Sequence, residues 1–549
     1  MEELQRPNRT APSWQPLAFS VVLILGIMIG RQFAGVPEVG LGFGIGSKSA
    51  LSGVLDRVER MYVDPVIRAE LEQIALKAVL EELDPHSVFI SSEELAELAE
   101  PMEGNFEGIG VEFIIQDDTL MVVAAIPGGP AERAGIRAGD RIVTVDSLEI
   151  SGPELTNRRV MELLKGPRGT QVMVGLDRKA GPKKVVLERD RIPIHSVVCS
   201  ANLDGERGYI KVVRFAQNTA IEFDQAMQAL SQQGLQEVII DLRGNGGGYL
   251  NAVVPMVESF LEKDQLVVYT EGEHAARRVY ASKRNGDWKD WDLVVLVDES
   301  SASASEIFAG AIQDHDRGPV IGRRTFGKGL VQEEFSIDDL GALRLTVARF
   351  YTPTGRAIQR PYGEGIDYSG DYFDRYESGE LFHQDSIALA DSLLFRTPKG
   401  KLVHGGGGIT PDVFLPLDTA RLSEYLSELS WSGILRDAAF SYVDENRDKL
   451  LSQDQLTSLS EPWKKESLEF LFQYAEQAGL PQEAEMSQLE EDELANRMFA
   501  QIIRNIAGES SYYEYLASED PAVQEAQRWL KNKRNISVVD GRLTLLQSE

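Results

Sequence analysis

The sequence predicts a multidomain α/β protein: a layered α/β core with an inserted β-rich module and a C-terminal helical region. From Gly208 to Gln313 buried strands alternate with helices, which is the rhythm of a layered core. Between Val111 and Leu176 several short strands and a short helix are typical of a small barrel-like module. Beyond Leu417 the chain is rich in acidic residues and helical in pattern.

Within the core, the predicted strands are Tyr209–Phe215, Val238–Leu242 and Leu293–Val297, and the predicted helices are Ala220–Leu230, Ala252–Leu261 and Ser303–Gln313. Within the β-rich module, the predicted strands are Val111–Ile114, Leu120–Val123 and Thr170–Leu176, and the predicted helix is Asn157–Leu164.

The bulk composition limits the function classes. A chain of 549 residues exceeds one hydrophobic core, so roughly two to four domains are expected. The net charge of -30 disfavours nucleic acid or an anionic lipid surface as the main partner, because both are negative as well. The single cysteine, Cys199, lies in an apolar β-like stretch, which favours a buried thiol over a nucleophile.

The first 35 residues predict a membrane anchor or a signal segment. Arg6 and Arg9 precede an apolar run, Leu17 to Gly30, that is shorter than the roughly 20 residues of a typical span. The run also fits the apolar part of a signal peptide. No clear small-residue cleavage site follows it, so an uncleaved anchor is favoured. Either interpretation places the rest of the chain outside the cytoplasm, and an inner-membrane anchor with the remainder in the periplasm is expected.

Between Leu51 and Leu83 apolar residues recur at helical spacing, and Ser91 to Glu94 has the pattern of a helix N-cap. The expected domains are 1–35 as the anchor or signal segment, 36–50 as a linker, 51–103 as the N-terminal helical part of the core, 104–191 as the β-rich module, 192–417 as the core, and 418–549 as the C-terminal helical region.

The strongest chemical signal is the turn of small residues that follows the strand ending at Val297. It opens a helix at Ser303, so it would expose a hydroxyl beside free backbone N–H groups. Serines chosen only to cap the helix explain this segment equally well when it is taken alone.

A second signal is Lys328, which stands between Gly327 and Gly329. Such a lysine can be desolvated, and desolvation lowers its pKa towards that of a general base. An ordinary solvated lysine is the alternative. None of the six histidines has a catalytic context, and no HExxH or paired Cys or His predicts a metal site.

A third signal is the glycine turn Gly244–Gly248 at the end of a predicted strand. Its N–H groups could bind an oxyanion. A phosphate-binding loop is the competing interpretation, but the GxxxxGK[ST] pattern is absent.

Together these motifs resemble the C-terminal processing (tail-specific) peptidases, serine proteases of the ClpP/crotonase-like type. The resemblance runs from Leu51 to Pro416. It is carried by Leu83–Ser87, Gly108–Gly110, Asp241–Asn245 with the following glycines, Ser301–Glu306, Phe326–Gly329 with Val331 and Gln332, and Gly405–Asp412.

The resemblance implies that Ser303 is the nucleophile and Lys328 the general base, without any metal or other cofactor. It further implies an oxyanion hole made by backbone N–H groups of Ala304 and of Gly247 or Gly248.

The third catalytic residue differs among members of the family. It corresponds here either to Gln332 or to Asp314. Gln332 is favoured, because an Asp314 carboxylate near the lysine would raise the lysine pKa.

The module at residues 104–191 resembles a PDZ domain. Its candidate carboxylate loop is Gly108, Ile109, Gly110 and Val111, whose N–H groups would meet a peptide C-terminus while the peptide adds as a strand. A plain structural glycine turn is the alternative. In the family such a domain also gates the active site.

The resemblance therefore implies a serine endopeptidase acting on proteins with exposed C-terminal tails. Two other function classes remain open: a non-catalytic PDZ scaffold that binds C-termini at the membrane, and a crotonase-like acyl-CoA enzyme. Residues 418–549 lie outside the resemblance and could serve packing, homo-oligomerisation or partner binding.

Overall fold

The computed structural model describes residues 49–178, 181–337, 340–388, 391–418, 424–447, 449–450, 460–482 and 486–546. The predicted anchor or signal segment, residues 1–35, lies outside these ranges. Among the described helices, none combines the length and apolar character needed to cross a membrane. The chain divides into two compact units, Met1–Ile74 and Ala75–Glu549.

The helical pattern between Leu51 and Leu83 forms two helices. These are α2 (Ala50–Met61) and α3 (Arg68–Glu81). Pro65 lies between them, and a proline disfavours helical backbone at the residue before it.

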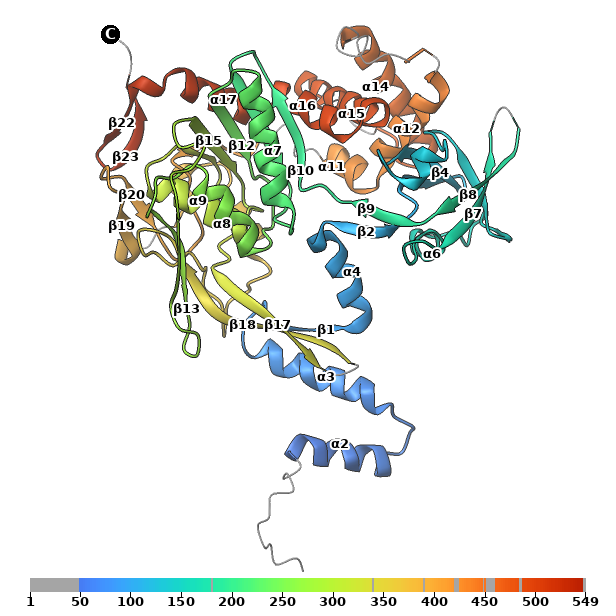
Figure 1. Cartoon of the computed structure of the whole chain (residues 1–549), viewed down its shortest axis with the longest axis horizontal. Coiled ribbons are helices and arrows are strands. Elements are labelled where there is room, and N and C mark those ends of the chain that lie inside the picture. The colour runs from blue at the N-terminus through green and yellow to red at the C-terminus, as the bar shows by residue number, and fades with distance from the viewer. Residues whose placement is uncertain are drawn as a thin grey trace, which may run out of the picture. The chain divides into compact units, whose positions relative to one another are not determined.

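A six-stranded sheet forms the centre of the second unit, and its layered α/β arrangement agrees with the prediction (Figure 1). Its strands, in spatial order, are β10 (Val197–Asn202), β11 (Arg207–Val212), β12 (Glu237–Asp241), β15 (Asp292–Val297), β16 (Val320–Gly322) and β21 (Val413–Phe414). β10 is antiparallel to β11 and the other pairs are parallel.

Both faces of this sheet are buried, because successive residues of a strand point to opposite sides. Ile240 belongs to the cluster formed with α7 (Thr219–Gln232), α8 (Leu250–Glu258) and α9 (Ala304–Asp314). Its neighbour Ile239 belongs to a second cluster, formed with α16 (Glu509–Glu519) and α17 (Pro521–Lys531). The end of the C-terminal region thus supplies one layer of the core.

A second, antiparallel sheet contains β1 (Val88–Ser91), β18 (Gly341–Tyr351), β13 (Leu266–Glu271) and β14 (Arg278–Ala281), and β17 (Leu330–Ile337) also pairs with β18. From β1 the chain enters α4 (Ser92–Glu103), whose N-cap is Ser91 in a capping box with Glu94, as predicted.

The β-rich module consists of β3 (Val111–Gln116), β4 (Thr119–Ala125), α5 (Pro130–Arg133), β5 (Arg141–Val145), β6 (Leu148–Glu149), α6 (Asn157–Leu164), β7 (Gln171–Asp177) and β8 (Lys183–Glu188). The pair β2 (Asn105–Gly108) and β9 (Asp190–Pro193) forms the two chain connections between this module and the core.

The C-terminal region begins with α11 (Glu424–Trp431), α12 (Ile434–Asn446), α14 (Ser460–Gln477) and α15 (Gln488–Ala507), which share their own hydrophobic cluster. Phe440 of α12 is buried against Ile114, Met121 and Val123 of the β-rich module. These helices therefore contact the module, whereas α16 and α17 cover the core sheet.

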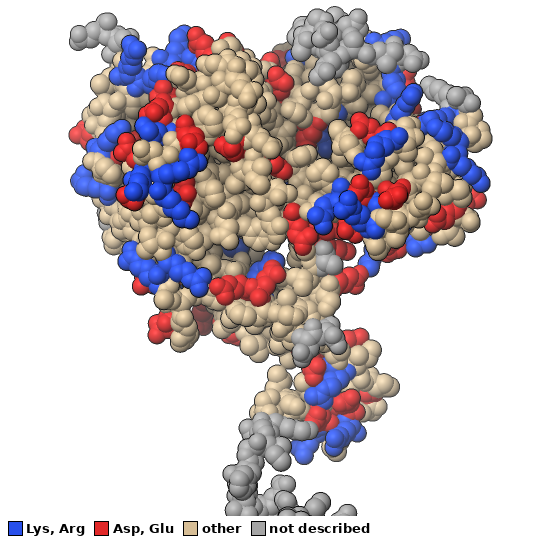
Figure 2. Space-filling view, in the orientation of Figure 1, with Lys and Arg blue, Asp and Glu red and all other residues tan. Residues whose placement is uncertain are grey.

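Among the described residues, the remaining elements are α10 (Asp371–Glu377), β19 (Leu394–Arg396), β20 (Leu402–His404), β22 (Ile536–Val539), β23 (Arg542–Leu545) and short 3-10 helices at Gln384–Ser386, Asp391–Leu393 and Lys533–Asn535. On the face shown in Figure 2, acidic and basic side chains are interspersed instead of forming one large patch of a single sign.

Candidate active site

The turn between β15 and α9 holds Ser303 in a strained backbone conformation. Its φ is 54° and its ψ is -110°, a region that residues other than glycine seldom occupy. Ser303 is partly exposed, whereas Ala302 and Ala304 on either side are buried. A Cβ added to Gly247 would stand 2.8 Å from the Ser303 Cβ. The glycine turn after β12 therefore lies directly against the serine.

Asp298 ties these two turns together. Its carboxylate accepts hydrogen bonds from the N–H groups of Ser301 and Gly244, both at 3.0 Å. The Ser301 hydroxyl in turn donates to the carbonyl of Leu242 at 2.9 Å. These polar contacts, of which the bond from Ser301 to Leu242 is buried, thus fix the position of the serine relative to the glycine turn.

Glu306, on the first turn of α9, links the backbone of the predicted nucleophile to that of the predicted base. One carboxylate oxygen accepts the N–H groups of Ser303 and Lys328, both at 2.8 Å. The other accepts the Thr325 hydroxyl at 2.6 Å and the Gly327 N–H at 2.7 Å. Glu306 is fully buried, and this burial raises its pKa to about 7 although four groups donate to it.

Lys328 is partly buried just before β17. Its Nζ donates to Gln332 Oε1 at 2.9 Å. Burial lowers the pKa of Lys328 below its ordinary value, and the positive charge of Arg344 acts in the same direction. Both effects favour the neutral amine that a general base requires.

The structure brings Gln332 to Lys328 and places Asp314 in a different network. The Gln332 amide contacts Lys328 and donates to the carbonyl of His86. Asp314, at the end of α9, is fully buried and pairs with Arg356 at 2.8 Å. It also accepts the N–H of Thr354 at 3.0 Å. Its carboxylate is therefore engaged by arginine.

The predicted oxyanion donors differ in their availability. The Gly247 N–H donates to the side chain of Asn245 at 2.9 Å. As the first residue of α9, Ala304 lacks an intrahelical acceptor for its N–H. Within the part of the chain that the structure describes, the Gly248 N–H has no protein acceptor either. Because their N–H groups are available, Ala304 and Gly248 are better candidates for oxyanion donors than Gly247.

Ser303, Lys328 and Gln332 line a common pocket of about 570 Å³. Much of its wall is apolar, with Leu95, Leu98 and Met102 of α4 facing Ile307 and Phe350. The pocket also includes Glu334 and Arg344, which form an ion pair at 2.6 Å. A hydroxyl, a basic amine and an apolar wall in one pocket suit nucleophilic attack on an apolar peptide segment.

The described residues contain no group of three or more His, Cys, Asp or Glu placed to hold a metal ion. Cys199 is buried, and burial raises the pKa of its thiol to about 12, so it is a poor nucleophile.

Comparison with known proteins identifies the family. The model of peptidase family S41 matches residues 206–368, a span that includes Ser303, Lys328 and Gln332. A carboxy-terminal-processing protease of Bartonella bacilliformis is 32% identical over 372 residues, which are 66% of this chain and 83% of that relative. The chain belongs to peptidase family S41. It is a serine-type peptidase related to the carboxy-terminal-processing proteases.

Other matches extend over different shares of this S41 peptidase. A probable CtpA-like serine protease of Staphylococcus aureus is 34% identical over 299 residues, 54% of this chain and 59% of that relative. A solved structure titled photosystem II D1 C-terminal processing protease is 29% identical and covers 68% of this chain and 90% of that chain, with a TM-score of 0.33. A PDZ model matches residues 121–178, and a family of unknown function matches residues 425–508.

The predicted carboxylate loop of the PDZ domain, Gly108–Val111, lies between β2 and β3. The carbonyl groups of Ile109 and Gly110 accept from Ala131 and Ile126, both at 2.9 Å. Over the described ranges, the N–H groups of Ile109 and Gly110 have no acceptor in the peptidase. The strand that follows the loop, β3, is an edge strand of its sheet.

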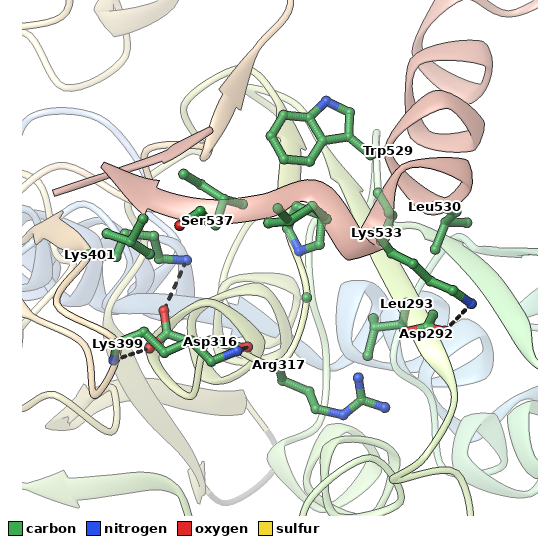
Figure 3. A pocket seen from close by; sticks show the side chains of 16 residues that line it. Asp292, Leu293, Asp316, Arg317, Lys399, Lys401, Trp529, Leu530, Lys533 and Ser537 are labelled. Carbon is green, nitrogen blue, oxygen red and sulfur yellow. Dashed lines mark hydrogen bonds and ion pairs between the residues drawn. The ribbon is translucent and has the colours of Figure 1, made fainter. Parts of the chain in front are cut away.

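A second cavity of the peptidase, of about 190 Å³, lies between the core and the C-terminal segment (Figure 3). Lys533 pairs with Asp292 at 2.5 Å, and Lys401 lies 3.7 Å from Asp316. Arg317 donates to backbone carbonyl groups. Because these charges already have protein partners, this cavity is a poor candidate for the reactive site.

Glu306 is the functional residue that sequence reasoning missed. It was part of the recognised motif, but no role was assigned to it. The spacing of Ser303 and Glu306 is that of a capping box, which predicts the contact to the serine N–H. No local pattern predicts that the same carboxylate also reaches Gly327 and Lys328.

Proposed function

We propose that this chain cleaves peptide bonds near protein C-termini with Ser303 as nucleophile, Lys328 as general base and Gln332 as the residue that orients the lysine. The observation that carries this proposal is the pocket shared by these three side chains, in which Glu306 links the serine and lysine backbones. That the layered core is of the ClpP/crotonase-like type is part of the same proposal.

In the acylation step, Ser303 Oγ attacks the substrate carbonyl carbon while its proton moves to Lys328 Nζ. The carbonyl oxygen becomes an oxyanion, which the N–H groups of Ala304 and Gly248 stabilise. The C–N bond then breaks, and the leaving amine takes the proton from Lys328. Water attacks the resulting ester, Lys328 again holds the proton, and its return to Ser303 releases the acid.

The PDZ domain would capture the substrate by its C-terminus. The available N–H groups of Ile109 and Gly110 support this role, since a peptide carboxylate is bound by such groups and the peptide adds to an edge strand. Gly108 and Val111 complete the loop. The apolar wall around Ser303 supports a preference for apolar residues near the scissile bond.

We further propose a cell-envelope location, with the N-terminal segment anchoring the chain in the inner membrane and the catalytic part in the periplasm. The apolar run from Leu17 to Gly30 after Arg6 and Arg9 supports this placement. Detection of the intact N-terminus in the membrane fraction, with protease access from the periplasmic side only, would test it.

The central test is cleavage of an unfolded protein that carries an apolar C-terminal tail. Wild type should cleave it, and Ser303→Ala and Lys328→Ala should each lose at least about a thousandfold in kcat/KM. Both variants should bind the tail with unchanged affinity in a fluorescence anisotropy assay. Tail binding by wild type without any cleavage would contradict the proposal and favour a PDZ scaffold.

A further inference from the structure

Three strands of the second sheet bring the turn before β1 next to the proposed general base. β18 lies between β1 and β17, and Gln332 of β17 stands opposite Thr346 of β18. The Thr346 N–H donates to the Ser87 hydroxyl, and the Thr346 hydroxyl donates to Asp84, both at 3.1 Å. The turn at residues 84–87 is therefore fastened to β18 at the position that faces Gln332.

The buried side chain of Asp84 shapes this turn. Its Oδ1 accepts the N–H groups of His86 at 2.9 Å and Ser87 at 3.0 Å, and its Oδ2 accepts the Ser87 hydroxyl at 2.6 Å. An aspartate that binds the backbone two and three residues later fixes a turn. The direction of the His86 carbonyl is fixed with it.

The His86 carbonyl determines how the Gln332 amide is oriented. A carbonyl oxygen can only accept, so the NH₂ group of Gln332 must face it. The amide oxygen of Gln332 then faces Lys328 Nζ, at 2.9 Å. The flipped amide would place two oxygens against each other and amide hydrogens against those of the lysine. The turn thereby ensures that Lys328 meets an acceptor.

This orientation matters because a neutral lysine amine has two N–H bonds and one lone pair. Donation of one N–H to Gln332 restricts rotation of the amine and leaves the lone pair for the pocket that Lys328 shares with Ser303. We propose that Asp84 is a positioning residue for the general base: it fixes the turn whose carbonyl orients Gln332, and Gln332 orients Lys328. This inference rests on the proposed function.

Asp84 also acts on Lys328 through its negative charge. This electrostatic effect can be separated from the effect of Asp84 on the shape of the turn. Its carboxylate raises the pKa of Lys328, as does that of Glu306, whereas burial and the charge of Arg344 lower it. Burial and the Lys328 charge lower the pKa of the nearby His86 to about 4, so the histidine is neutral over the range in which lysine titrates. Asp84→Asn would remove the charge and keep an oxygen for the turn.

The experiment compares Asp84→Asn and Asp84→Ala with wild type in the full chain, using the unfolded substrate with an apolar tail. Asp84→Ala should lower kcat by about 10- to 100-fold with little change in KM, because the lysine loses its orientation. Asp84→Asn should keep kcat within a few fold. Its acid limb of kcat/KM should move to lower pH, because the lysine pKa falls when the nearby negative charge is removed.

Asp204→Ala is the matched control. Asp204 accepts the N–H groups of Glu206 at 3.0 Å and Arg207 at 2.9 Å, so it shapes a similar turn between β10 and β11. This variant should keep the wild-type kcat and pH profile. If Asp84→Ala fails to fold, Ser87→Ala replaces it, since it removes the hydroxyl between Asp84 and Thr346 and should lower kcat several-fold.

Wild-type kcat in Asp84→Ala or Ser87→Ala would overturn the inference. So would equal losses in Asp84→Asn and Asp84→Ala without a shift of the acid limb. These outcomes differ from failure of the proposed function, in which wild type would bind the substrate without cleaving it, or wild type and Ser303→Ala would cleave it equally.

Discussion

As the proposed general base, Lys328 could take a proton from Ser303 only when it is itself neutral, so the proposal implies that the groups around Lys328 set the pH range of activity. Burial favours the neutral amine, and the Arg344 guanidinium adds to this effect by repulsion. Asp84 and Glu306 act in the opposite direction. The pKa of Lys328 lies below its ordinary value because the first two effects are the larger.

Replacement of Arg344 by glutamine tests this balance. Without the positive charge the pKa of Lys328 rises, so the acid limb of the kcat/KM profile should move to higher pH, opposite to the shift expected for Asp84→Asn. Arg344→Lys keeps the charge and should keep the wild-type profile. An unchanged acid limb in Arg344→Gln would show that Lys328 does not control it.

At the residue scale, the sequence predicted the local part of the site better than the part that depends on folding. Ser303, Lys328 and Gln332 lie in short motifs, and the structure brings their side chains into one pocket. From the sequence, Gln332 was favoured over Asp314 because of the expected effect on the lysine pKa, and the pairing of Asp314 with Arg356 is seen only in the structure. Likewise, no sequence pattern predicts that Glu306 of α9 accepts the N–H groups of Gly327 and Lys328.

At the scale of elements, the predicted carboxylate loop of the PDZ domain contains a glycine at which an added side chain would be both strained and crowded. Gly110 has a φ of +75°, and a Cβ there would stand 2.9 Å from the Ile192 side chain. Gly128, in the same domain, has a φ of +73° but no atom within 4 Å of an added Cβ. An alanine would be strained by the positive φ at both positions, but its methyl group would be crowded only at Gly110.

Gly110→Ala and Gly128→Ala should therefore each destabilise the PDZ domain by about 1 kcal/mol from strain at positive φ, and Gly110→Ala should cost more because of its contact with Ile192. Only Gly110→Ala should weaken binding of an apolar tail peptide, by roughly 10-fold, because the added methyl contacts the Ile192 side chain and relief of this contact moves that side chain or the loop. Fluorescence anisotropy with a free-acid peptide measures this, and the amidated peptide shows how much depends on the carboxylate. Equal tail affinities for the two variants would remove this loop from the binding site.

Other elements show where periodicity succeeds and where it fails. The helix Asn157–Leu164 was predicted with the observed bounds, because its apolar spacing and its boundaries are local. The helical pattern from Leu51 to Leu83 was predicted without its interruption, although Pro65 marks it. The long pair β17 and β18 was not predicted, since pairing across a turn depends on contacts that a single strand pattern does not contain.

At the scale of the whole molecule, the C-terminal region has two separate packing partners. Phe440 of α12 packs on the PDZ domain, and Arg504 of α15 pairs with Glu112 of that domain at 2.7 Å. The later helices α16 and α17 bury the second face of the core sheet. The acidic, helical pattern after Leu417 indicated helices, but an amphipathic helix does not specify the surface that it covers.

Two tryptophans of the C-terminal region test this division of roles. Trp529 of α17 is 4% exposed and packs with Ile239 and Val294 of the core sheet, whereas Trp431 at the end of α11 is 91% exposed. Trp529→Ala should lower the free energy of unfolding of the core by about 3–5 kcal/mol, because it leaves a cavity beneath β12 and β15. Trp431→Ala should change it by no more than about 0.5 kcal/mol.

Amide hydrogen exchange in β12 and β15 during chemical denaturation is the suitable readout, because it reports the core separately from the PDZ domain. Faster exchange in these strands for Trp529→Ala, with PDZ exchange unchanged, would mean that the C-terminal segment stabilises the sheet that carries the Ser303 and glycine turns. If the core strands of Trp529→Ala exchange as in wild type, the packing of α17 does not stabilise the core sheet, and the core must be stable without this second layer.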